Sequence, residues 1–68
     1  MISRKEVLNL IESFLRGREK WLKTNTLISL EYETKATALI ELLEINEIGS
    51  INSVSMSIKD RYERLKAK

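Results

Sequence analysis

The chain has no cysteine, no histidine and no proline, and it has only two glycines. Without cysteine it can form no disulfide bond, and without cysteine or histidine the usual zinc sites are excluded as well. Because proline and glycine are the main interrupters of helices, their scarcity favours long uninterrupted helices. The sequence therefore indicates a helical protein whose stability comes from packing alone.

Long apolar runs are also missing. No stretch approaches the roughly 18 apolar residues of a membrane-spanning helix. The first six residues lack the apolar stretch and small-residue cleavage site of a signal peptide. Segment 4–23 carries basic residues and Trp21, but three glutamates dilute its charge, and its apolar face is needed within the fold. We therefore expect a cytoplasmic protein that does not bind a membrane.

What remains is the composition of a small folded protein. The 68 residues are 43% hydrophobic and 32% charged, which is typical of a folded rather than a disordered chain. A chain of this length forms one domain, near the lower limit for a stable core. Its high content of isoleucine, asparagine, lysine, glutamate and serine resembles that of small open reading frames of low-GC bacteria and their phages.

The net charge of +2 is spread unevenly along the chain. Residues 1–25 and 50–68 are both basic, whereas residues 26–49 are acidic. An acidic middle segment between two basic ones suits helices that pack against one another through complementary rims. It is also compatible with a basic binding face formed by the two ends.

Apolar spacing predicts an all-α fold of three helices, at about 4–23, 27–48 and 53–65. Ser3 and Glu6 form a capping box at the start of the first helix. The run 24–26 consists of residues that prefer caps and turns, and Gly49 is suited to end the second helix. With so short a first connection, we expect an antiparallel hairpin of the first two helices, with the third packed across it.

The third segment has an ambiguous pattern. Residues 54–58 alternate like a strand, but no other segment alternates, so such a strand would have no partner. Helical spacing continues through Ile51, Val54, Ile58, Tyr62 and Leu65, so we predict a helix.

The predicted core draws on all three helices. Gly17 is either a tolerated surface glycine or a point of close approach, and Arg18 is expected to extend from the apolar stripe to its rim. The core should include Leu8, Ile11, Phe14, Leu15, Leu22, Tyr32, Leu39, Leu43, Ile58 and Tyr62.

The helix at 27–48 is apolar around roughly 220° of its circumference, about twice what one core requires. Such a helix needs neighbours on two sides, so we expect a protein–protein interaction module. Its partner is a second copy, in a homodimer, or a larger protein that it regulates or inhibits; otherwise the third helix covers the whole arc of a monomer. The predicted partner-binding residues are Leu27, Leu30, Leu42, Ile45 and Ile48.

Enzyme chemistry is not indicated. The chain has no phosphate-binding loop and no nucleophile elbow, and we expect no cofactor, no metal and no small-molecule ligand. Three glutamates, Glu41, Glu44 and Glu47, follow one another at three-residue steps, where we expect a solvated strip.

A helix-turn-helix that binds DNA is the alternative. Residues 44–50 would form the end of the supporting helix and the turn, and residues 53–61 the reading helix. The Ser-Val-Ser-x-x-Ile run from Ser53 resembles recognition helices of bacterial regulators. Ile45, however, stands where such motifs have a small residue. The residues available to DNA would be Ser53, Ser55, Ser57, Lys59, Arg61 and Arg64.

Overall fold

The computed structural model describes residues 2–49 and 56–67, and these form three α-helices. Helix α1 spans Arg4–Trp21, α2 spans Thr26–Glu47 and α3 spans Ile58–Lys66. No strand occurs among these residues. The prediction of an all-α fold with three helices is confirmed for the described part of the chain.

Local side-chain chemistry sets the helix ends. The Ser3 hydroxyl accepts a hydrogen bond from the Glu6 backbone N–H, and the Asn25 side chain accepts one from the Ile28 N–H. Each bond satisfies a backbone donor that has no partner inside the helix. At the other end of α2, Gly49 has a φ of +91°, a conformation that glycine adopts without strain.

Helix α3 begins later than the sequence pattern indicated. Met56 and Ser57 precede the helix, and the Ser57 hydroxyl accepts a hydrogen bond from the Asp60 backbone N–H at 3.2 Å. Ser57 is thus the N-cap of α3. Its hydroxyl binds the Asp60 N–H, a backbone donor that has no partner inside the helix at this end. The predicted start at Ser53, and the ambiguous residues 54 and 55, lie outside the described residues.

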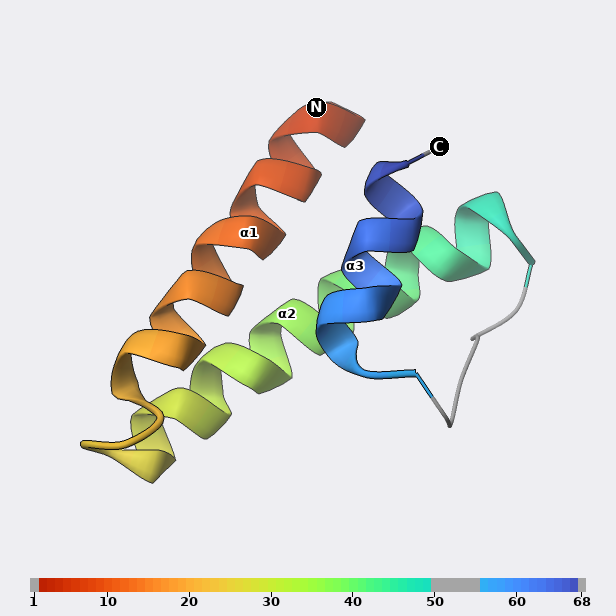
Figure 1. Ribbon diagram of the computed structural model, residues 1–68. Coiled ribbons are helices and arrows are strands. Elements are labelled where there is room, and N and C mark those ends of the chain that lie inside the picture. The colour runs from red at the N-terminus through yellow and green to blue at the C-terminus, as the bar shows by residue number, and fades with distance from the viewer. Residues whose placement is uncertain (1, 50–55, 68) are drawn as a thin grey trace.

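The three helices meet around one small core. Helices α1 and α2 are joined by a short turn and run in opposite directions, and α3 packs beside the C-terminal half of α2 (Figure 1). Of the predicted core, Leu22 is wrong: it follows the last residue of α1 and is 48% exposed. The buried apolar residues are Ile11, Ala36, Ile40, Leu43, Tyr62 and Leu65. Packed against them and partly buried are Val7, Leu8, Phe14, Leu15, Leu39 and Ile58.

Gly17 marks a close approach of α1 and α2. A Cβ atom built at Gly17 would lie 3.0 Å from three ring carbons of Tyr32. The Tyr32 ring also contacts Phe14, with ring centroids 6.2 Å apart. The absence of a side chain at Gly17 is therefore what lets an aromatic ring of α2 rest on the backbone of α1.

Ion pairs connect α2 to both of its neighbours. Arg4 Nε donates to Glu47 at 2.7 Å, and the Arg4 Nη2 atom donates to the Leu65 carbonyl at 2.6 Å. Glu44 is bound by Arg61 of α3. The expected solvated strip of glutamates is therefore wrong for Glu44, which is 1% exposed, and Glu47 is engaged as well. These pairs agree with the expectation that basic flanks pack against an acidic middle.

Candidate interaction surface

The side of α2 that faces away from the core is apolar along most of its length. Its uncharged exposed residues, which we call the outer strip, are Leu27, Leu30, Thr34, Ala38, Leu42 and Ile45; the exposed Glu31 and the half-buried Glu41 lie within the same arc. At 100° per residue they lie within about 60° of a common direction, on the opposite side of the helix from Ala36, Ile40 and Leu43. Helix α2 thus carries one apolar face into the core and a second one into solvent.

The large apolar side chains of the outer strip are unusually exposed for residues aligned along one face of a helix. Leu27 is 76% exposed, Leu30 and Leu42 are each 54% exposed, and Ile45 is 50% exposed. Single exposed leucines are ordinary, but an aligned set on one helix is typical of a binding surface. Four of the five predicted partner-binding residues therefore share one face, while Ile48 is half-buried at the C-terminal end of α2.

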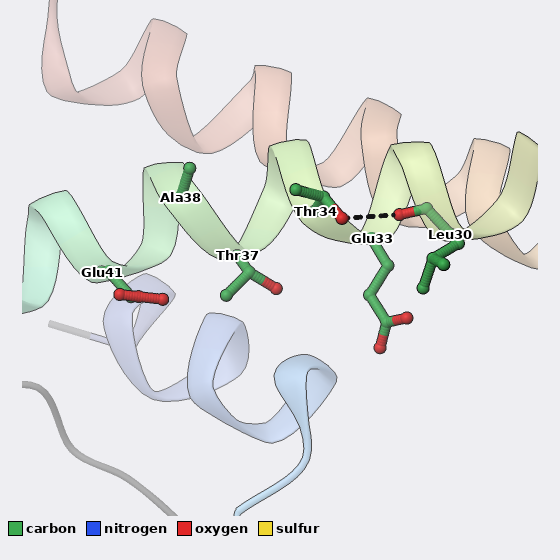
Figure 2. A pocket seen from close by; sticks show the side chains of 6 residues that line it. All are labelled: Leu30, Glu33, Thr34, Thr37, Ala38 and Glu41. Atoms are coloured by element: carbon green, nitrogen blue, oxygen red, sulfur yellow. Dashed lines mark hydrogen bonds between the residues drawn. The ribbon is translucent and has the colours of Figure 1, made fainter.

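The centre of the outer strip is flattened by small side chains. The Thr34 hydroxyl donates to the Leu30 carbonyl at 2.9 Å, so its polar atom is satisfied within the helix and its methyl group remains for contact. An open depression runs along this region, and Figure 2 shows Leu30 and Thr37 pointing away from α1 beside it. The depression is lined by Leu30, Glu33, Thr34, Thr37, Ala38 and Glu41.

A second open depression continues the first toward the start of α2. Its lining combines Leu27, Leu30 and Thr34 with the charged residues Glu31 and Lys35. The Lys35 amino group lies 5.9 Å from the Phe14 ring centroid and 6.0 Å from that of Tyr32, so it leans toward the aromatic pair. The two depressions share Leu30 and Thr34, and the carboxylates of Glu31, Glu33 and Glu41 also line them.

The predicted DNA-contacting residues are only partly available. Arg61 donates from Nε and Nη2 to the Glu44 carboxylate, and this hydrogen bonding raises the pKa of Arg61 above its ordinary value. Ser57 is occupied as the N-cap of α3, and Arg64 also has an interaction partner. Lys59 is exposed, while Ser53 and Ser55 lie outside the described residues. The described part of this candidate site is thus committed mainly to holding α3 in place.

Neither a membrane-spanning helix nor a metal-binding cluster occurs among the described residues. No helix in residues 2–49 or 56–67 is both long enough and apolar enough to cross a membrane. Nor do these residues bring together three acidic, histidine or cysteine side chains in a group that could hold a metal ion.

Comparison of the chain with protein-family models, with curated proteins and with solved structures found no match.

Sequence reasoning missed Thr34 as a member of the outer strip. A polar residue between Leu30 and Ala38 breaks an apolar pattern on paper, although its hydroxyl is satisfied by the helix backbone in the structure. The signal that would have found it is spacing: Thr34 follows Leu30 by four residues, where a threonine hydroxyl reaches the preceding carbonyl.

Proposed function

We propose that this protein is a small non-enzymatic interaction module that binds another protein through the outer strip of α2. The observation that carries the proposal is the alignment of Leu27, Leu30, Leu42 and Ile45 on the solvent side of a helix whose other side forms the core. A regulator or inhibitor that docks on a protein target would act through such a surface.

Energetics support this use of the strip. Burying apolar surface contributes about 25 cal/mol for each Å² removed from water, so four half-exposed aliphatic side chains supply several kcal/mol before ordering costs. The strip belongs to the longest helix, which ion pairs and the core hold on its other sides. A preorganised surface of this kind loses little conformational entropy when it binds.

Site-specific photo-crosslinking in the cells that make the protein tests the proposal. A photoreactive phenylalanine analogue at Leu30 or Leu42 should give a covalent adduct with a protein of defined mass. The same analogue at Ser13, an exposed position of α1, is the matched control and should give none. The proposal is overturned if the strip positions give no adduct, or give the same adducts as Ser13.

DNA binding by the segment after Gly49 stays a prediction and receives less support. Arg61, one of the cations proposed to contact DNA, is paired with a buried carboxylate, so releasing it to a phosphate would remove its guanidinium from the buried Glu44.

A further inference from the structure

We infer that the occupant of the outer strip is a second copy of the same strip, paired antiparallel about a two-fold axis at the level of Ala36. This inference rests on the proposed function and names its partner. A two-fold interface requires one surface to be complementary to itself, so that each contact occurs twice. The outer strip meets that requirement in its spacing, its shape and its area.

The spacing of the outer strip reads the same in both directions. Its members follow one another at steps of three, four, four, four and three residues. When two such helices lie antiparallel, Leu27 faces Ile45 of the partner copy, Leu30 faces Leu42, and Thr34 faces Ala38. Leu30 and Leu42 lie on opposite flanks of the strip, which lets side chains of the two copies interdigitate as they do in antiparallel coiled coils. Every large apolar residue of the strip thereby gains a large apolar partner.

The shape of the outer strip also suits this pairing. The small residues Thr34 and Ala38 stand at its centre, and the larger Leu27 and Ile45 stand at its ends. Interaxial distances between packed helices fall to about 8 Å where contact residues are small. Two copies can therefore approach closely at the axis while the end residues fill the space between diverging helices.

The area of the outer strip sets the strength of the pairing. Complete burial removes on the order of 100 Å² of apolar surface from water for each leucine or isoleucine. With Leu27, Leu30, Leu42 and Ile45 between 50% and 76% exposed, two copies bury about 500 Å² of apolar surface between them. Since interfaces are little more than half apolar, the total is about 900 Å², which is below the range of stable specific complexes and typical of weak, transient ones. We therefore expect half of the chains to be dimeric at a protein concentration of about micromolar to tens of micromolar.

Cysteine cross-linking tests the register, because the natural chain has no cysteine to interfere. We expect a mixture of Leu30→Cys and Leu42→Cys proteins to form a disulfide-linked heterodimer under mild oxidation. Each variant alone should stay uncrosslinked, because the two copies of position 30 would lie about 18 Å apart along the helix. Disulfide formation requires Cα atoms within about 7 Å. Ser13→Cys is the control for random collision and should not cross-link with either variant.

Sedimentation of the unmodified protein over a wide concentration range completes the test. A shift from monomer to dimer with rising concentration, together with the heterodimer disulfide, supports the inference. Cross-linking of each single variant with itself would indicate parallel pairing and would overturn the proposed register. A dimer that forms without the heterodimer cross-link would also overturn the register. A protein that stays monomeric at hundreds of micromolar overturns self-pairing. Photo-crosslinking then separates the two proposals, since an adduct with a different protein sustains the proposed function alone.

Discussion

The carboxylate of Glu44 is buried and is held by two nitrogens of Arg61, Nε at 3.1 Å and Nη2 at 2.5 Å. Glu44 belongs to α2 and Arg61 to α3, so the pair joins the two helices. A buried charge is tolerated only where a partner compensates its lost hydration. This pair therefore ties α3 to α2, in addition to the packing of Tyr62 and Leu65 in the core.

Removing either member of this pair should destabilise the protein strongly. We expect Arg61→Met to lower the free energy of unfolding by about 3 kcal/mol or more, because it leaves the Glu44 carboxylate buried without its cation. The double variant Glu44→Leu with Arg61→Met should lose far less than the two single changes together. Urea denaturation followed by circular dichroism measures these differences.

The exposed pair of Arg16 and Glu12 provides the matched control for Arg61. Arg16→Met should change stability by less than about 1 kcal/mol, as is usual for a surface ion pair. Equal losses for Arg16→Met and Arg61→Met would show that burial of Glu44 does not matter.

Replacement of Gly17 should have an effect whose sign depends on Tyr32. An alanine in a helix interior ordinarily stabilises by about 1 kcal/mol relative to glycine. Here its Cβ would stand 3.0 Å from the Tyr32 ring, so we expect Gly17→Ala to destabilise the natural protein. In a Tyr32→Ala background the same change should stabilise it. Thermal unfolding of the four proteins measures the reversal, and stabilisation in both backgrounds would contradict the close approach.

Stability should fall at alkaline pH because of Tyr62. Burial raises the pKa of the Tyr62 phenol above its ordinary value of 10.0, and the nearby carboxylates of Glu12 and Glu63 raise it further. The unfolded chain then releases this proton at lower pH than the folded one does. The contribution is fully present below about pH 10 and is lost as the pH rises through the folded-state pKa.

Comparison with Tyr62→Phe isolates this contribution, because lysine deprotonation affects both proteins alike. The difference in unfolding midpoint between the two proteins should be constant near neutral pH and should shift in favour of the phenylalanine variant above about pH 10. A difference that stays constant across the whole range would contradict burial of the phenol.

Salt should distinguish protein pairing from DNA binding. In the register that pairs Leu30 with Leu42, Glu31 would lie level with Glu41 of the partner copy, so their like charges would repel. Screening of this repulsion should leave the dimer unchanged or strengthen it between about 50 and 200 mM salt. Binding of a mixed-sequence DNA duplex would instead weaken steeply over the same range. Sedimentation and fluorescence anisotropy measure the two responses.

The helix ends and the apolar excess of α2 could be predicted from sequence because they depend on near neighbours. The Ser3 cap, the break near Asn25 and the Gly49 terminus each follow from residues within one helical turn. The later start of α3 was open to the same reasoning, since Ser57 and Asp60 repeat the spacing of Ser3 and Glu6. The helical spacing of Ile51 and Val54 with Ile58 favoured the earlier start instead.

The burial of Glu44 could not be predicted in this way. On a helical wheel it belongs to the polar side of α2, and its partner Arg61 lies 17 residues further along the chain. Only the packing of α3 brings the two together. The same packing decides that the outer strip, and not the glutamate row, is the surface left to solvent.

Arg4 donates hydrogen bonds to the Glu47 carboxylate and to the Leu65 carbonyl. These bonds hold the beginning of α1 beside the end of α3 (Figure 1). A short flexible linker could therefore join the two chain ends, and a cut between Lys23 and Thr24 would open the exposed turn instead. Such a circular permutant would keep all three helices intact and would place both new ends at the opposite pole of the molecule. It would also place the attachment points for labels or fusion partners close to Leu27, the first residue of the outer strip.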